Sequence, residues 1–386
     1  MKRARVRPWP PTGHAVADLH EVDLARLPGV AADDFAAAYR AFRASALAIN
    51  ADREPGRPAV PPDATLRAVC ARAFRRRADM PAAEAREFFS AHFSAWRIVP
   101  LAGQARHDEG GTRGFVTGYY EPELAASFDG SPAFKAPVLS RPNDLVTLAP
   151  SETPAGFDAS LAAARRLPDG RLVPYPARAE IEAAFPLGCQ VLAWLPDHVE
   201  VFLVQVQGSA RLRFADGATA RLGYAGRNGH PYTSIGRKLI ERGAIAEADM
   251  SLAALKQWLR AQGAAGRALM RENASYVFFR FEEGLDPALG PCAAASVQLT
   301  PLRSIAIDRG LWSYGLPFWL DARLPWEGPA ATLLRRLMIA QDTGSAIVGP
   351  ARADIFFGTG DAAGARAGDI RHAAEMHVLL PREEFA

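Results

Sequence analysis

The most constraining feature of the sequence is a change near Arg113 from a helical to a β-rich residue pattern. Before it, three stretches that begin at Asp33, Asp63 and Pro81 have helical apolar spacing, and each opens with an acidic cap or a proline. After it, runs such as "GFVTGYYEPEL" and "VEVFLVQVQGSARLRF" are short, β-rich and separated by glycine and proline. This order predicts a mainly β protein with N-terminal helices, built as a barrel or a sandwich.

Helical segments interrupt the β-rich part of the chain. Stretches that begin at Ala177, Ser234 and Ser251 have helical spacing, and the last two stop at Gly243 and Gly263. The chain then returns to strands in "SYVFFRF", "ADIFF" and "MHVLLP". Because 386 residues suffice for two domains, we expect a domain boundary near residue 270.

Composition excludes several classes of function. The 45 basic and 42 acidic residues leave a net charge of only +3, so no nucleic-acid partner is expected. The three cysteines lack CxxC spacing, the eight histidines form no metal motif, and "GTGDAAG" has the wrong spacing for a dinucleotide fold. We therefore expect no metal and no organic cofactor. The start, "MKRARVRPWPP", has basic residues without an apolar segment behind them, so no export signal is predicted.

Three aspartates stand beside apolar runs, where half-buried strands normally carry uncharged side chains. They are Asp308, Asp342 and Asp354. A poorly solvated carboxyl has a raised pKa, which suits it to donate a proton near neutral pH. Asp342 fits a catalytic acid and an Asx-turn residue at a strand end equally well, whereas Asp308 and Asp354 fit structural hydrogen bonding better.

Two polar, aromatic stretches could bind a polysaccharide. "TGYYEPEL" begins at Thr117 and "QVQGSARL" begins at Gln205. Aromatic faces stack on sugar rings and amides pair with sugar hydroxyls. Gln205 and Gln207 would share one face of a strand. An equally good interpretation places Tyr119 and Tyr120 in the core and the glutamines inside a barrel.

From Phe115 to the C-terminus the chain resembles lytic murein transglycosylases of the A type, which carry a C-terminal three-aspartate (3D) domain. The resemblance rests on ordered motifs that include "FVTGYYEPEL", "VQVQGSARLRFADG", "GYAGRNGHPYTSIGRKLIERG" and "QDTGSAIVGPARADIFFGTG". It implies a double-psi β-barrel domain with N-terminal helices from residues 1–114 and 272–386. A second, β-barrel-like domain, residues 115–271, would be inserted as the substrate-groove domain.

The resemblance also implies the chemistry. The family's three aspartates fall on Asp308, Asp342 and Asp354, with Asp342 as the single acid and then base that forms 1,6-anhydro-muramic acid ends without water. Asp354 and Asp308 would support it, and Ser345 stands where the family often has a glycine. The substrate-binding residues expected are Tyr119, Tyr120, Glu121, Gln205, Gln207, Gly208, Ser209, Asn273 and Thr343.

By the same resemblance the ligand is a peptidoglycan glycan strand, and we expect a monomer in the periplasm, with outer-membrane association and a cell-wall synthesis complex left open. Two other classes of function remain. An inverting hydrolase would need Asp354 or Glu121 as a second carboxylate. A non-catalytic wall-binding module would depend on Tyr119 or Tyr120 and would tolerate loss of the Asp342 carboxyl.

Overall fold

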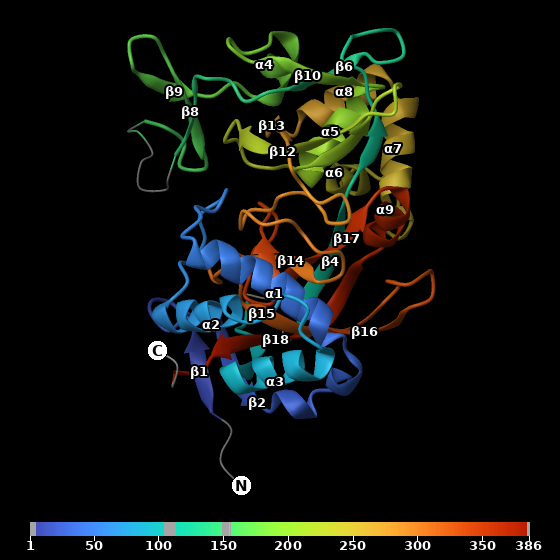
Figure 1. Ribbon diagram of the computed structural model, residues 1–386. Coiled ribbons are helices and arrows are strands. Elements are labelled where there is room, and N and C mark those ends of the chain that lie inside the picture. The colour runs from blue at the N-terminus through green and yellow to red at the C-terminus, as the bar shows by residue number, and fades with distance from the viewer. Residues whose placement is uncertain (1–4, 104–112, 149–153, 155, 384–386) are drawn as a thin grey trace. The chain divides into compact units, whose positions relative to one another are not determined.

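The computed structural model describes residues 5–103, 113–148, 154 and 156–383, and the chain separates into two compact units (Figure 1). The barrel unit comprises Met1–Tyr120 and Leu285–Ala386, and the insert unit comprises Glu121–Gly284. The expected boundaries after residues 114 and 271 both lie earlier in the chain. The later return point follows from strand β13 (Val277–Glu282), which pairs with β12 (Thr219–Arg227) and so stays in the insert unit.

The barrel unit is organised around one nine-stranded sheet with the order β1-β2-β3-β18-β15-β16-β14-β17-β4. Because β4 also pairs with β18, the six strands from β18 to β4 close into a barrel. Closure leaves these six strands without a free edge. The strands are β1 (Val6–Trp9), β2 (Ala17–Val22), β3 (Phe93–Pro100), β4 (Gly114–Glu121), β14 (Ser304–Ile307), β15 (Pro317–Leu324), β16 (Thr332–Asp342), β17 (Arg352–Thr359) and β18 (Arg371–Pro381).

Helices α1 (Phe35–Asn50), α2 (Ala64–Phe74) and α3 (Ala82–His92) pack on this sheet, with α1 against β16 and α2 against β18 (Figure 1). The side chains of Asp34 and Asp63 cap the first two helices by accepting hydrogen bonds from backbone N–H groups. A shorter helix, α9 (Asp361–Gly368), packs beside β17. The helices explain why the barrel strands are long runs of buried residues, since apolar side chains are needed on both faces of the sheet.

An irregularity in the barrel sets the direction of one aspartate. In the parallel pairing of β14 and β16, Ile305 lies opposite Ala340 and Ala306 lies opposite Asp342, so Gln341 is an extra residue. The buried Gln341 amide binds the backbone and side chain of α1 at Ala41 and Ser45. The bulge is therefore anchored to the helix, and it re-aims the last residue of β16.

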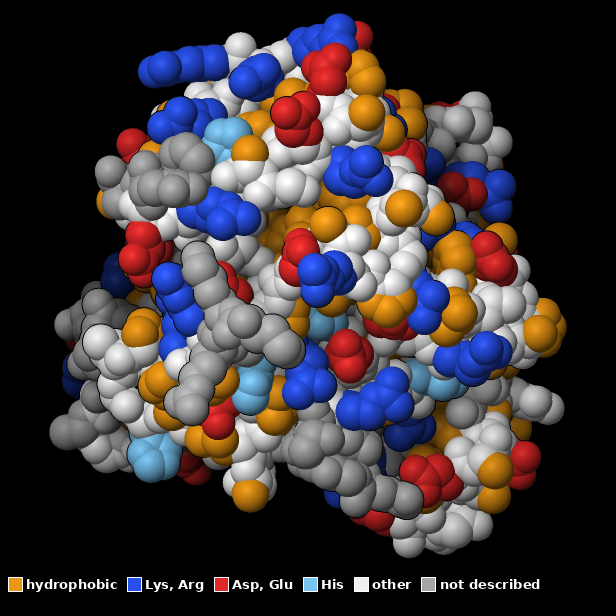
Figure 2. Space-filling view, turned by 90° about the horizontal axis from the view of Figure 1, so that it is seen from below, with side chains coloured by type: hydrophobic (Ala, Val, Ile, Leu, Met, Phe, Trp, Pro, Cys, Tyr) orange, Lys and Arg blue, Asp and Glu red, His pale blue; other side chains and the backbone are white. Residues whose placement is uncertain are grey.

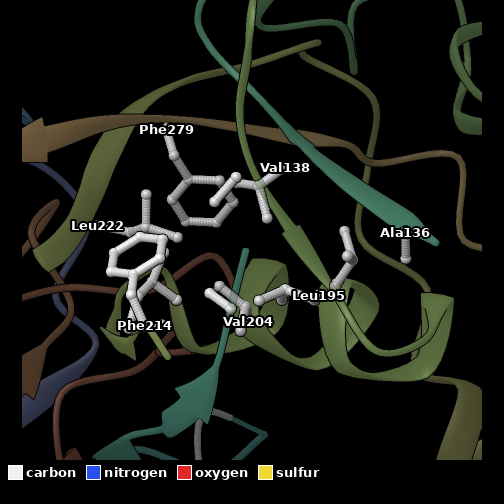
Figure 3. Close-up of a cluster of buried hydrophobic side chains, with 12 residues drawn as sticks. Ala136, Val138, Leu195, Val204, Phe214, Leu222 and Phe279 are labelled. Carbon is white, nitrogen blue, oxygen red and sulfur yellow. The ribbon is translucent and has the colours of Figure 1, made fainter. Parts of the chain in front are cut away.

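The insert unit combines small sheets with helices. Its sheets are β13-β12-β11-β5, β10-β6 and β7-β8-β9. Side chains from the first two sheets and from α5 meet in one apolar cluster that includes Val138, Leu195, Val204 and Phe279 (Figure 3). The remaining elements are β5 (Glu123–Ala125), β6 (Ala136–Leu139), β7 (Leu145–Thr147), β8 (Ala163–Arg166), β9 (Leu172–Pro174), α4 (Arg178–Ala183), β10 (Val191–Leu195), α5 (His198–Gln207), β11 (Ala210–Arg213), α6 (Ile235–Glu241), α7 (Leu252–Ala261) and α8 (Ala264–Arg271). The helices expected at Ala177, Ser234 and Ser251 are confirmed by α4, α6 and α7.

One strand prediction is wrong. The segment "HVEVFLVQVQ" is helix α5, not a strand, because Asp197 caps its start by accepting from Glu200 N and Gly208 ends it with φ 83°. Its residues from Val199 to Gln205 are buried all round, which a helix in a core allows and which leaves no polar stripe to reveal the helical period. Gln205 and Gln207 are therefore about 200° apart around a helix and do not share a face.

Charges on the face seen in Figure 2 are mixed, with acidic and basic side chains interspersed. Within the described ranges, no helix is both long enough and apolar enough to cross a bilayer.

Candidate active site

Asp342 ends β16 and its carboxylate accepts two long-range hydrogen bonds. The Tyr119 hydroxyl donates to Oδ2 at 2.9 Å and the Ala294 N–H donates to Oδ1 at 3.2 Å. These donors are 223 and 48 positions away in the chain, so the contacts are tertiary, unlike those of an Asx-turn. Tyr119 lies on β4, and its ring packs against Phe356 of β17 with centroids 5.3 Å apart.

Tyr119 is a neutral donor over the working pH range. Burial raises the pKa of its phenol well above the usual value, and the neighbouring Asp342 charge and hydrogen bond raise it further. A phenol that keeps its proton can donate only outward, toward the carboxylate. The contact therefore holds Asp342 in one orientation.

Asp354 lies close to Asp342 on the same face of the barrel wall. Ala306 of β14 is the register partner of Asp342 on one side and of Asp354 on the other, so all three side chains point the same way. The Thr117 hydroxyl donates to Asp354 Oδ1 at 2.5 Å and accepts from Arg352 Nη2 at 2.8 Å.

The electrostatics of Asp354 differ from those of a solvated aspartate. Burial raises its pKa, the Arg352 charge and the Thr117 hydrogen bond oppose this, and the Asp342 charge adds to the increase. The Arg352 guanidinium itself has a lowered pKa because it is buried, and Asp354 opposes that shift. Asp354 thus keeps its proton to higher pH than a carboxyl in water, which reduces the negative charge that Asp342 faces.

Asp308 and Thr343 hold the loop that follows Asp342. Asp308 accepts hydrogen bonds from the N–H groups of Gly310 at 2.9 Å and Gly349 at 2.7 Å, and the Thr343 hydroxyl donates to Ile307 O at 2.9 Å. These contacts tie the loop to the end of β14. Through these contacts Asp308 helps to fix the position of the loop.

Tyr120 and Glu121, expected to bind substrate, are buried instead. The Tyr120 ring lies over Gly364 of α9, where an added Cβ would come within 2.6 Å of it. Glu121 is fully buried and pairs with Arg221, with Nε and Oε1 2.8 Å apart. A buried carboxylate needs such a partner. The described structure therefore assigns both side chains to packing and ion pairing.

The remaining expected residues lie in the insert unit, where several bind the protein itself. Gln205 accepts from Arg178 Nη1 at 2.6 Å and donates to Val277 O, and the Asn273 side chain accepts from Thr233 N and Ser275 N. Ser209 is buried and Gly208 is the left-handed cap of α5, while Gln207 is partly exposed. The buried amides thus form a framework, because their hydrogen-bonding groups already have partners.

Sequence reasoning missed Thr117, Arg352 and the Ala294 N–H. Period-two alternation could have found the first two, since Thr117 shares a strand face with Tyr119 and Arg352 shares one with Asp354. A backbone donor carries no side-chain signal. Among the described residues, no group of three His, Cys, Asp or Glu side chains is placed to hold a metal ion.

The protein combines a closed barrel that carries Asp342 and Asp354 on its wall with an inserted β-rich unit. This combination is matched by two family models, one for each part. The MltA specific insert domain matches residues 115–280, and the 3D domain matches residues 303–380. The chain is 33% identical over 270 residues to the membrane-bound lytic murein transglycosylase A of Escherichia coli (strain K12). That alignment covers 68% of this chain and 64% of the relative, which is slightly less than two thirds of its length.

Solved structures extend the similarity to nearly the whole chain. The crystal structure of a membrane-bound lytic murein transglycosylase from Agrobacterium tumefaciens has a TM-score of 0.81 and 34% identity, over 95% of this chain and 99% of that one. The structure of E. coli MltA with bound chitohexaose has a TM-score of 0.62 and 25% identity, over 98% and 94%. The chain therefore belongs to the membrane-bound lytic murein transglycosylase A family.

Proposed function

We propose that the protein is a lytic transglycosylase that cleaves the β-1,4 bond between N-acetylmuramic acid and N-acetylglucosamine in peptidoglycan. The observation that carries this proposal is the Asp342 carboxyl, which ends a bulged barrel strand and is oriented by Tyr119 and the Ala294 N–H. Family membership supplies the substrate class. The chitohexaose bound to E. coli MltA is a β-1,4-linked sugar chain, which agrees with it.

The reaction needs one carboxyl group for two proton transfers. Protonated Asp342 donates its proton to the glycosidic oxygen as the bond to C1 of the muramyl residue breaks. The C6 hydroxyl of the same residue then attacks C1, and the Asp342 carboxylate removes its proton. The products are a free hydroxyl on the leaving sugar and a 1,6-anhydro-muramic acid end, so no water is consumed and Asp342 is protonated again.

The neighbouring residues would support this cycle in different ways. Tyr119 orients Asp342, and Asp354 limits the negative charge beside it by keeping its own proton to higher pH. Asp308 and Thr343 fix the loop beyond the catalytic residue. We assign Asp354 and Asp308 supporting roles and Tyr119 a place beside the bound sugar, whereas Thr343 is buried and its hydroxyl already donates to Ile307 O.

The proposal extends to architecture and location. We infer that the barrel unit is a double-psi β-barrel, that the insert unit contributes the substrate groove, and that the protein acts as a monomer in the periplasm. The relatives' description as membrane-bound supports an association with a membrane. Glycan strands of peptidoglycan are the proposed partner.

An inverting hydrolase is the second candidate, and one observation favours it. Asp342 and Asp354 flank Ala306, so their Cα atoms lie about two strand spacings apart, roughly 10 Å. Inverting enzymes place their two carboxyl groups about 6.5 to 9.5 Å apart to admit a water, a separation that side chains on Cα atoms at this spacing can reach. In that mechanism Asp354→Asn would be as damaging as Asp342→Asn.

Mass spectrometry of fragments released from purified peptidoglycan separates these functions. We expect products that end in 1,6-anhydro-muramic acid from the unaltered protein, and none from Asp342→Asn, which keeps the shape of the side chain but cannot transfer a proton. Asp79→Asn removes an exposed carboxyl of the same unit and should leave the products unchanged. Reducing ends would point to the hydrolase, and absence of any product would favour a binding module.

A further inference from the structure

A pocket outside the candidate active site lies wholly within the insert unit. Its lining comes from β6 and the residue before it, α4 and the segment after it, β10, α5 and the residue before β13, and it includes Lys135, Arg178, Glu182, Trp194 and Tyr276. The proposed reaction uses none of these side chains. The pocket therefore needs a separate explanation.

The floor of the pocket holds a buried cation whose charge is only weakly compensated. Arg178 is 2% exposed and donates hydrogen bonds to Gln205 Oε1 and to the carbonyl oxygens of Asn273 and Ser275, all of them neutral. The carboxylate beside it, Glu182, is 3.6 Å away. Burial lowers the pKa of Arg178, but a guanidinium remains charged in proteins. Neutral acceptors satisfy its N–H groups without cancelling its charge.

Glu182 is shared among several arginines. Arg271 Nε lies 2.9 Å from Glu182 Oε2, and Arg267 Nη2 lies 3.7 Å from the same oxygen. Lys135 also lines the pocket, so together with Arg178, Arg267 and Arg271 the basic groups at and beside the pocket outnumber Glu182. Arg267 Nε is buried and has no hydrogen-bond partner among the described residues.

The imidazole of His198, another lining residue, responds to this local field. Its pKa is lowered first by burial and then by the Arg267 charge, with a further decrease from Lys135, while Glu182 and Asp197 oppose the shift. A histidine that resists protonation leaves the excess charge on the arginines and the lysine. The pocket is thus electropositive because of permanent cations.

The other walls are apolar. Phe185 is 48% exposed at the mouth, and Trp194 and the buried Tyr276 line the interior. Arg178 stacks between Tyr276 and Phe202, with its guanidinium carbon 5.2 Å and 4.9 Å from the two ring centroids. Aromatic walls beside fixed cations suit a ligand that has a carboxylate next to aliphatic groups.

We propose that this pocket binds a carboxylate of a short acidic peptide, and that the peptide is the stem peptide of peptidoglycan. The assignment of the stem peptide rests on the proposed function, because stem peptides are attached to the muramic acid residues of that substrate. Each stem peptide has free carboxylates separated by short aliphatic segments. A pocket for it in the insert unit would distinguish peptide-bearing strands from bare glycan.

The experiment is isothermal titration calorimetry with purified stem peptide, which contains no glycosidic bond and is not cleaved. We expect saturable binding by the whole chain, and at least tenfold weaker binding of the same peptide after its carboxyls are amidated. Lys135→Gln together with Arg267→Gln should also weaken binding at least tenfold. Both side chains reach solvent, so their replacement should not disturb folding.

Arg171→Gln is the matched control, since Arg171 is an exposed arginine of the same unit that pairs with Asp169 in the turn before β9. Its affinity should stay within twofold of the unaltered protein. Equal binding of free and amidated peptide would overturn the proposal. So would a double variant that binds the free peptide as tightly as the unaltered protein does. Tetraglutamate binding as tightly as the stem peptide would overturn the choice of ligand. None of these results depends on anhydro products, so failure here leaves the proposed reaction untouched.

Discussion

Tyr119→Phe isolates the contribution of a single oxygen to the candidate active site. The variant removes the hydroxyl that donates to Asp342 Oδ2 at 2.9 Å and keeps the ring that packs against Phe356. Because the phenol is protonated over the working range, the lost contact is a hydrogen bond to a carboxyl group and involves no change of charge. The prediction therefore tests orientation of Asp342 rather than packing.

The magnitude follows from the strength of such a contact. In the second proton transfer Asp342 is a carboxylate, and a hydrogen bond to a charged group contributes about 1.5 to 3 kcal/mol, which corresponds to roughly a 10- to 160-fold change in the rate of that step if the whole contribution is needed to hold the reacting geometry. Asp342 would keep the Ala294 N–H as a donor, so the lower half of that range is expected. The free energy of unfolding should change by less than about 1 kcal/mol, because Asp342 is only partly buried and water can replace the hydroxyl.

The assay is the initial rate of anhydro-product release from peptidoglycan, with urea denaturation run on the same preparations. Tyr232→Phe, which removes the hydroxyl of a tyrosine in the insert unit that is 37% exposed, should have the activity of the unaltered protein. A Tyr119→Phe rate within twofold of the unaltered protein, in a preparation whose Asp342→Asn variant is inactive, would refute the positioning role. A rate loss accompanied by a large loss of stability would refute the claim that packing is preserved.

Two further predictions concern stability. Asp33 binds the Arg303 guanidinium with two contacts of 2.8 and 2.9 Å, so Asp33→Ala leaves that guanidinium buried without a counter-charge. The variant should lower the free energy of unfolding by about 3 to 5 kcal/mol in a denaturant titration, and a loss below about 1 kcal/mol would contradict this. Burial lowers the pKa of His377 to about 4. Below pH 6.5 the unfolded chain therefore binds a proton that the folded chain does not. The free energy of unfolding should fall between pH 6.5 and pH 4 by up to about 3 kcal/mol. Urea titrations of His377→Gln over that range should lack this decrease, and equal pH dependence in both proteins would count against it.

Local signals in the sequence were enough to place many of the elements. Ser234 and Ser251 were expected to start helices, and in the structure their side chains cap α6 and α7. A cap acts through hydrogen bonds to the next few residues, so its signal is complete within a short window. The strands in "ADIFF" and "MHVLLP" were recognisable for a similar reason, since β-branched and aromatic residues favour a pleated backbone wherever it lies.

Helix α5 shows where local reasoning ends. Its alternating valines favour a strand, yet the segment is a helix because Asp197 and Gly208 cap it and the surrounding core buries it on every side. Burial all round erases the polar stripe from which a helical period is read. Packing therefore decided that Gln205 is a buried helical residue, and it also placed the Gln205 amide where Arg178 donates a hydrogen bond to it.

The sequence by itself marked Asp308, Asp342 and Asp354 as candidates, because a carboxyl beside apolar runs is unusual in any fold that buries those runs, and the resemblance to a family then selected Asp342. Only the tertiary structure decided how they act together. Barrel closure placed Thr117 and Tyr119 of β4 beside Asp354 and Asp342, more than 200 positions away, and the bulge at Gln341 turned Asp342 toward its donors. Such contacts depend on strand order and register, which follow from the packing of the whole barrel and leave no trace in neighbouring residues.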